Sequence, residues 1–155
     1  MKYGIKSHKG MVREINEDSY NVIFNSSKMA VAFILADGMG GHSAGEVASK
    51  MAVDYISSSL ESIFDNLREE NIETTMREII EKANDIIYQK SSEPGPYFGM
   101  GTTLLMAIFL GKKLYVIHIG DSRAYLMRDG VIKQLTTDHS YVEELIKNGS
   151  ITRVE

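Results

Sequence analysis

Hydrophobic residues recur along the chain with two different periods, and the order of these periods predicts the architecture. Weak alternation over residues 3–7 predicts a short first strand, and residues 11–17 have the mixed charges of a polar loop. A second strand is expected over residues 19–25. Residues 29–36 are continuously apolar, which is typical of a strand buried on both faces. The first quarter of the chain is therefore expected to form strands.

Two helices and then a series of strands are expected next. Apolar residues recur at intervals of three and four over residues 48–67 and again over 72–87, so each segment predicts an amphipathic helix. Pro94-Gly95-Pro96 should end the helical section. Beyond it the pattern predicts strands at 102–110, 113–120, 123–128 and 131–135, with Asp129-Gly130 as a hairpin turn, and a short helix over 140–148.

This order of elements predicts the α+β class, with helices covering a largely antiparallel sheet. The chain has 155 residues, of which 43% are hydrophobic, and this is enough to form a core. No internal repeat, linker or low-complexity tract divides it. We therefore expect a single domain over residues 1–155.

Composition excludes several classes of function. The net charge is −4 with acidic and basic residues interspersed, so no basic stripe indicates a nucleic-acid surface. The absence of cysteine excludes disulfides, thiolate metal sites and a cysteine nucleophile. No apolar run resembles a secretory signal or reaches transmembrane length, so a cytoplasmic protein without membrane contact is expected.

Acidic residues occur at two positions where a predicted strand meets a loop. Glu17 and Asp18 precede one strand, and Asp37-Gly38 follows the next. Converging carboxylates repel one another unless a cation neutralises them, and oxygen ligands favour a hard cation such as magnesium or manganese. Glycine would let a backbone carbonyl approach such an ion closely. By spacing alone, solvated surface acids and an Asp-Gly turn at the end of a strand are the simpler interpretation.

Five short motifs in series resemble those of a known family. They resemble the metal-dependent serine/threonine protein phosphatases of type 2C, especially the compact bacterial branch, and the resemblance extends from Tyr3 to Thr152. It implies an antiparallel β-sandwich flanked by helices in α-β-β-α layers, incomplete at the C-terminus. The motifs are Asn16-Glu17-Asp18, Asp37-Gly38-Met39-Gly40-Gly41-His42, Gly99-Met100-Gly101-Thr102-Thr103, Gly120-Asp121-Ser122-Arg123 and Leu135-Thr136-Thr137-Asp138-His139-Ser140.

The resemblance implies a role for each of the acidic positions. Asp37 resembles the carboxylate that bridges two metal ions, and Glu17 with the Gly38 carbonyl would complete the ligands of one of them. Asp18 resembles the acid that orients metal-bound water. Asp121 resembles a ligand of the additional metal ion of bacterial relatives. The implied cofactors are Mn²⁺ or Mg²⁺, with two or three ions in the complete domain.

The resemblance also implies a reaction and its partners. Arg13 resembles the arginine that holds the substrate phosphate, a task that suits a guanidinium because two N–H groups meet two phosphate oxygens. His42 resembles the histidine that protonates the leaving alkoxide. The implied reaction is hydrolysis of phosphoserine and phosphothreonine in proteins by a metal-bridging hydroxide. A serine/threonine kinase acting on the same proteins is implied as well.

The match also has a limit, which leaves alternatives open. The family's second half contributes two further metal-binding aspartates, which a chain of 155 residues is expected to lack, so we expect impaired turnover. One alternative is a non-catalytic fragment that binds phosphopeptides or a partner, and another is a regulatory domain without an active site. His118 and His139 are expected to be structural, and His8 is expected to affect only a turn. The sequence predicts no oligomeric state.

Overall fold

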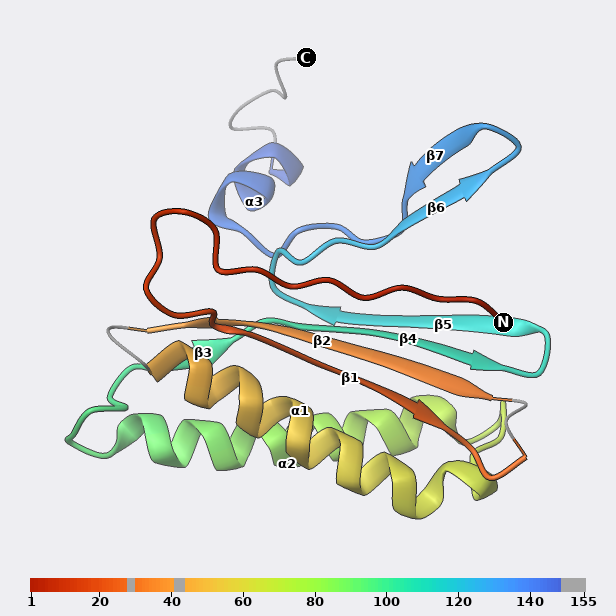
Figure 1. Cartoon of the computed structure of the whole chain (residues 1–155), viewed down its shortest axis with the longest axis horizontal. Helices are drawn as coiled ribbons and strands as arrows, with labels where there is room; N and C mark the ends of the chain where they lie inside the picture. Colours follow the sequence, from red (N-terminus) through yellow and green to blue (C-terminus); the bar gives the residue numbers. More distant parts are fainter. Residues whose placement is uncertain (28–29, 41–43, 149–155) are drawn as a thin grey trace.

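The computed structural model describes residues 1–27, 30–40 and 44–148 of the chain (Figure 1). Its elements alternate as the hydrophobic periods predict, first strands, then two long helices, then strands and a short helix, so the α+β prediction is confirmed. In order they are β1 Asp18–Phe24, β2 Val31–Met39, α1 Ala44–Ile63, a 3₁₀ turn η1 Phe64–Asn66, α2 Ile72–Ser92, β3 Gly101–Thr102, β4 Leu104–Leu110, β5 Lys113–Ile119, β6 Tyr125–Arg128, β7 Val131–Gln134 and α3 Tyr141–Lys147.

The main sheet is antiparallel and has the strand order β1-β2-β4-β5, with the short β3 paired to the end of β2. The connection from β2 to β4 contains both long helices, so strands far apart in sequence become neighbours. In the β1–β2 register Asp18 lies opposite Asp37 and Tyr20 opposite Leu35. The sheet therefore brings two acidic residues together at one of its ends.

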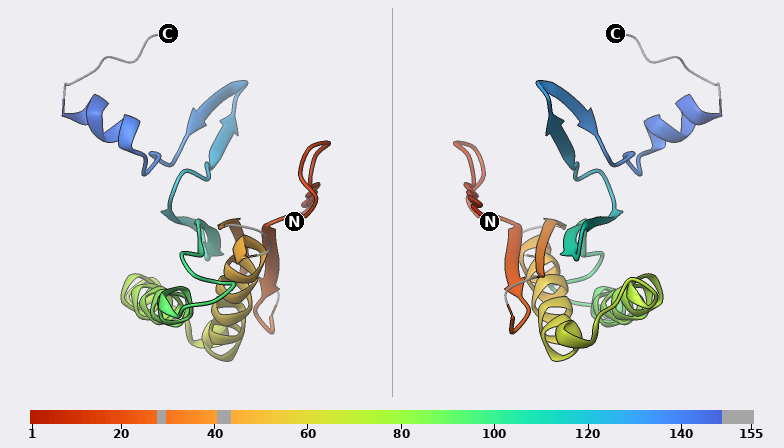
Figure 2. Two further views of the ribbon diagram at one scale, coloured as in Figure 1. Left: turned by 90° about the vertical axis from the view of Figure 1, so that its left-hand side faces the viewer. Right: turned by 90° about the vertical axis from the view of Figure 1, so that its right-hand side faces the viewer.

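Helices α1 and α2 lie side by side on one face of the sheet (Figures 1 and 2). The inner face of β2 consists largely of small residues such as Ala32 and Ala36, both fully buried, which lets α1 approach closely. The helices and sheet together enclose one main core, whose largest fully buried side chains are Ile34, Ile56, Leu60, Leu67, Met76, Met106 and Ile108. Among the described residues, no helix is both long enough and apolar enough to cross a membrane.

Two buried serines connect α1 to β1 within this otherwise apolar layer. The Ser57 hydroxyl accepts a hydrogen bond from the Asn21 side-chain amide at 2.9 Å. Two turns earlier in the helix, Ser49 lies 3.1 Å from the hydroxyl of Ser19. Because Ser19 and Asn21 alternate with outward-facing residues of β1, both point toward the helix. These polar contacts tie the strand to the helix at two separate positions.

The opposite face of the sheet is also apolar, which is unusual for an antiparallel sheet with one open side. The N-terminal segment covers part of it, with the Tyr3 ring 6.1 Å from the Phe24 ring and 5.6 Å from the Phe33 ring. Leu35 and Phe109 on this face are each 38% exposed, so burial on both faces is incomplete. The outer face consists of Tyr20, Val22, Phe24, Val31, Phe33, Leu35, Leu105, Ala107, Phe109, Leu114, Val116 and His118.

Several predicted elements differ from the structure, among them the strand expected over 123–128, which begins only at Tyr125. Residues 3–7 form no strand. Their apolar side chains contact the outer face of the sheet, and this contact does not require their backbone to pair with a strand. Strand β2 continues through Asp37-Gly38, which the sequence placed in a loop, because β1 and β3 pair with these residues. The predicted strand over 102–110 is divided at Thr103.

The β6–β7 hairpin extends away from the main sheet on the side opposite to the long helices (Figure 2). Its turn has φ values of 52° at Asp129 and 76° at Gly130. Positive φ at both central residues matches the twist of the flanking strands, and Asp-Gly is a preferred pair there. The hairpin turn predicted from the sequence is confirmed.

A pair of methionines allows the core to be tested. Met106→Ala removes a side chain that is fully buried between sheet and helices, so it should lower the free energy of unfolding by about 2–5 kcal/mol. Met127→Ala, at a position 71% exposed on the hairpin, should change it by less than about 0.5 kcal/mol. Urea denaturation of both variants measures the difference, and equal losses would contradict the assigned core.

Candidate functional site

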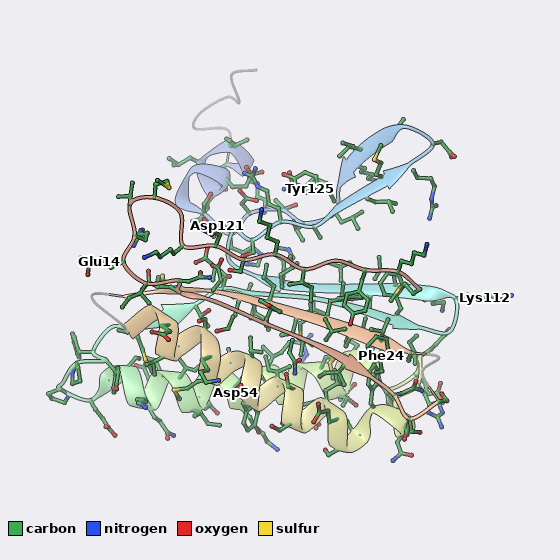
Figure 3. All side chains as sticks on the ribbon, in the orientation of Figure 1. Glu14, Phe24, Asp54, Lys112, Asp121 and Tyr125 are labelled. Atoms are coloured by element: carbon green, nitrogen blue, oxygen red, sulfur yellow. The ribbon has the colours of Figure 1, made fainter. Side chains whose placement is uncertain are left out.

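Four acidic residues converge at one end of the sheet. Asp18 and Asp37 are direct partners on neighbouring strands, and Glu17 immediately precedes β1. Asp121 follows β5 and lies above the sheet on the side away from the long helices, whereas Asp54 lies on the helical layer (Figure 3). Residues from three separate parts of the sequence thus contribute carboxylates to one region.

The electrostatics of Asp37 reflect this convergence. Burial raises the pKa of the Asp37 carboxyl above its ordinary value, and the negative charges of Asp18, Asp121 and Glu17 raise it further. The positive charge of Arg13 acts in the opposite direction. The Asp37 carboxylate is therefore repelled by all three of the other negative charges, and a bound cation would reduce this repulsion.

Glu17 lies between the end of β2 and the first turn of α1. Its side chain is 15% exposed, and its Oε2 atom accepts a 3.4 Å hydrogen bond from Arg13 Nη1. Its Oε1 atom is buried and has no hydrogen-bond partner in the described part of the chain. A buried carboxylate oxygen without a donor is costly, and a cation would satisfy it.

Two glycines make room for this carboxylate. A Cβ atom at Gly45 would collide with Glu17 Oε1 and lie 2.8 Å from the Gly38 carbonyl carbon. A Cβ atom at Gly38 would collide with the Gly45 carbonyl oxygen and lie 2.9 Å from the Glu17 carbonyl oxygen. Strand and helix therefore approach so closely here that only glycine fits at either position.

Hydrogen bonds hold the backbone around the acids. The Glu17 carbonyl accepts from the Gly38 amide at 3.1 Å and from the Ser49 hydroxyl at 2.6 Å. The Asp37 amide donates to Thr103 Oγ1 at 3.0 Å, and the Thr103 amide donates to the Asp37 carbonyl at 2.9 Å. Asp37 is thus positioned by strand pairing and by Thr103, whereas Glu17, which precedes β1, is positioned by the two hydrogen bonds to its carbonyl.

Thr103 also connects Asp37 to the loop that contains Asp121. Its hydroxyl lies 2.8 Å from the hydroxyl of Ser122, the neighbour of Asp121. Sequence reasoning included Thr103 in a motif but assigned no role to it, and it did not single out Ser49. The motif over residues 99–103 was the available signal for Thr103, whereas a serine inside an amphipathic helix gives no comparable signal.

Asp18 is held by a short polar network on the N-terminal segment. Its Oδ2 atom accepts from the Ser7 hydroxyl at 3.2 Å, and Asn16 Nδ2 donates to Ser7 Oγ at 2.7 Å. The Asp18 amide donates to Asn16 Oδ1 at 3.2 Å. Nearby, His8 Nδ1 accepts from the Gly10 amide at 3.0 Å, so His8 takes part in a turn as expected.

The donor chemistry of this region fits a hard cation. Its side-chain ligand atoms are carboxylate oxygens, one of them buried without a partner, and burial together with the neighbouring negative charges raises the pKa of Asp37. Across the described residues, no set of three or more acidic or histidine side chains is already gathered as a complete ligand set. The acids thus share one electrostatic environment without forming a closed cage.

The structure brings most of the predicted site residues into one region. Glu17, Asp18, Asp37 and Asp121 interact electrostatically, and Arg13 lies against Glu17 with its side chain 75% exposed. Gly38 lies at the close contact with α1. His42, the predicted acid for the leaving group, lies outside the described residues.

A second polar cluster follows β5. Arg123 forms a two-pronged ion pair with Asp138, with Nη2 to Oδ2 at 2.6 Å and Nε to Oδ1 at 2.9 Å. The His139 ring packs 4.5 Å from the His118 ring, which agrees with a structural role for both. His139, expected from its place beside Asp138 to be a capping and packing element, does not cap α3; the cap is Ser140, whose hydroxyl accepts from the Glu143 amide.

Removing the central charge should stabilise the metal-free protein. Asp37→Asn keeps the side-chain size but removes one of four repelling charges, so without divalent cations its melting temperature should rise by roughly 2–4 °C, equivalent to about 1 kcal/mol. Millimolar Mn²⁺ should then stabilise the wild type but not the variant. The control is Asp54→Asn on α1, whose carboxylate pairs with Lys50. A lower melting temperature for Asp37→Asn in chelator would contradict the charge cluster.

His118 should make stability sensitive to acid. Burial, followed by the charge of His139, lowers the pKa of His118 below 6.5, so the unfolded chain binds a proton more readily than the folded one. Stability should therefore be lost as pH falls through about 6.5. Between pH 7.5 and 5.5 the melting temperature of His118→Phe should fall by roughly 2 °C less than that of the wild type. The exposed His8→Phe serves as control and should behave as the wild type does.

Comparison with known proteins identifies the family of this chain. Residues 7–149 match the family model of protein phosphatase 2C. The chain is 40% identical over 148 residues to the serine/threonine phosphatase stp of Listeria innocua, covering 96% of this chain and 58% of that protein. It is 36% identical over 155 residues to the serine/threonine protein phosphatase PstP of Mycobacterium tuberculosis, covering all of this chain and 28% of that protein.

Solved structures agree as well. The serine/threonine phosphatase of S. agalactiae superposes with a TM-score of 0.87 at 38% identity, covering 94% of this chain and 59% of that one. The catalytic domain of PstP in complex with two manganese ions gives a TM-score of 0.76 at 37% identity, covering 95% of this chain and 60% of that one. The chain thus spans less than two thirds of the length of these relatives. Sequence and fold agree that the chain belongs to the protein phosphatase 2C family.

Proposed function

We propose that residues 1–155 are part of one phosphatase domain that hydrolyses phosphoserine and phosphothreonine in proteins. The main support is the convergence of Glu17, Asp18, Asp37 and Asp121 at one end of the sheet, where burial and the three neighbouring charges raise the pKa of Asp37. Two relatives named as serine/threonine phosphatases, at 40% and 36% identity, support the choice of substrate.

The proposed cofactor is Mn²⁺ or Mg²⁺. Glu17, Asp37, the Gly38 carbonyl and Asp121 would hold the ions, since together they offer only oxygen ligands. Bound there, the ions would supply an activated hydroxide and stabilise charge on the phosphoryl oxygens. The two manganese ions named for the PstP catalytic domain support this assignment. Asp18, fixed by Ser7, would orient water next to the ions.

Arg13 is the proposed group for the substrate phosphate. Its guanidinium is largely exposed and lies beside Glu17 at the edge of the acidic region, where its planar fork could meet two phosphate oxygens. The contact with Glu17 leaves other N–H groups of the guanidinium to reach a ligand. His42 is proposed to protonate the leaving alkoxide.

The alternative is binding of phosphopeptides without turnover. It is favoured by one observation, that no three acidic or histidine side chains of the described residues form a ready set of metal ligands. A chain with only part of the ligand set would retain Arg13 and some metal affinity while losing hydrolysis. The cytoplasmic location and the kinase partner stay predictions.

Manganese-dependent hydrolysis of p-nitrophenyl phosphate separates these functions. The wild type should show weak activity that needs Mn²⁺, and Asp37→Asn should lower it by at least about 100-fold because a proposed metal ligand is lost. Asp54→Asn, which removes an acid on the helical layer, should leave activity unchanged. Binding of Mn²⁺ by calorimetry without hydrolysis would favour the binding function, and absence of both would overturn the site.

Substrate binding can be tested with two matched arginines. Arg13 and Arg77 each pair with a glutamate four residues away, and their side chains are 75% and 67% exposed. Arg13→Ala should raise KM for a phosphoserine peptide about 10- to 100-fold, since a charged hydrogen-bond pair is lost. Arg77→Ala on α2 should not change KM. Equal KM values for all three proteins would contradict the role of Arg13.

A further inference from the structure

We infer that Ser49 is a positioning residue for the acidic site, acting through the backbone of Glu17. This inference rests on the proposed metal site. Ser49 lies on α1, carries no charge and is fully buried, so it touches neither solvent nor substrate. Its effect on metal binding would come entirely from the peptide that it holds.

The Ser49 hydroxyl is part of a short chain of hydrogen bonds that ends at Glu17. Ser49 Oγ lies 2.6 Å from the Glu17 carbonyl oxygen, 3.1 Å from Ser19 Oγ and 3.2 Å from the Glu46 carbonyl oxygen. A hydroxyl has one proton to donate, and the shortest contact is with Glu17. Ser19 can then donate to Ser49, which completes a chain from β1 through α1 and back to the residue that precedes β1.

The bonded carbonyl belongs to the peptide that joins Glu17 to Asp18. This carbonyl also accepts from the Gly38 amide at 3.1 Å, so α1 and β2 hold the same oxygen from two directions. The amide of that peptide donates to Asn16 Oδ1 at 3.2 Å. With both ends bonded, the peptide plane is fixed, and the directions of the Glu17 and Asp18 side chains follow from it.

The Glu17 side chain has little room to adapt if the plane of this peptide changes. Its carboxylate occupies the space that glycine leaves at Gly45, and a rotation of the peptide would drive Oε1 into the first turn of α1. Losing the Ser49 bond would free the peptide on its helix side and leave the Glu17 carbonyl with the Gly38 amide alone. Groups that orient metal ligands commonly change metal affinity 10- to 100-fold when removed.

Ser57 provides a matched control on the same helix. It is 5% exposed, lies eight residues after Ser49, and bonds to the Asn21 side chain of the same strand. It therefore shares burial, helix, residue type and partner strand with Ser49. The difference is that its contact lies in the middle of β1 and involves no acidic residue of the site.

The test is calorimetric titration of Mn²⁺ into the wild type, Ser49→Ala and Ser57→Ala, together with melting temperatures in chelator. Ser49→Ala loses the hydrogen bonds to Glu17 and Ser19, and Ser57→Ala loses the one to Asn21, so both variants should melt at lower temperatures than the wild type. Mn²⁺ should bind Ser49→Ala about tenfold more weakly than the wild type, and Ser57→Ala as tightly as the wild type. If Ser49→Ala does not fold, Ser49→Cys, which keeps the volume with a weaker donor, should show a smaller loss in the same direction.

Three results would overturn the inference, and they differ in whether the proposed metal site survives. Equal Mn²⁺ affinity of the wild type and the Ser49 variant would exclude the positioning role and leave the metal site standing, as would equal losses in the two serine variants. Absence of Mn²⁺ binding by the wild type would overturn the proposed metal site and the inference together.

Discussion

The close contact between the end of β2 and the first turn of α1 determines where the acidic site lies. Only glycine fits at Gly38 and Gly45, and the space that they leave contains the Glu17 carboxylate. The contact requires small residues on the inner face of β2 as well, and Ala32 and Ala36 provide them. Backbone proximity in one corner thus connects the packing of the core to the chemistry at its edge.

The acidic cluster opposes folding while it prepares the protein to bind a cation. Burial and three like charges raise the pKa of Asp37, so the charged form is less favourable in the folded chain than in the unfolded one. A cation that binds only the folded state would stabilise it by mass action and so offset this loss of stability. The same residues that lower the stability of the metal-free protein therefore provide the driving force for metal binding.

The sequence predicted the helices and most strands well because their hydrophobic periods are long and regular. It placed Glu17, Asp37 and Asp121 in one site only through family resemblance, since strand pairing between β2 and β4 is not visible in local patterns. The expected strand at residues 3–7 is absent because contacts of Tyr3 with aromatic side chains do not require a backbone ladder. Ser49 and Thr103 could not be assigned roles because a hydroxyl's partner depends on tertiary packing.

Because both faces of the sheet are apolar, the register of its strands must be determined by something other than polarity. In most antiparallel sheets a slip of one residue is prevented because it would bury polar side chains, but here hydrophobicity hardly distinguishes the two faces of β2. Size distinguishes them instead, since a slip would turn Phe33 and Leu35 toward the helix where alanines now lie. The same slip would separate Asp18 from Asp37. The difference in size between the large and small apolar residues, and not a difference in polarity, therefore keeps Asp18 paired with Asp37.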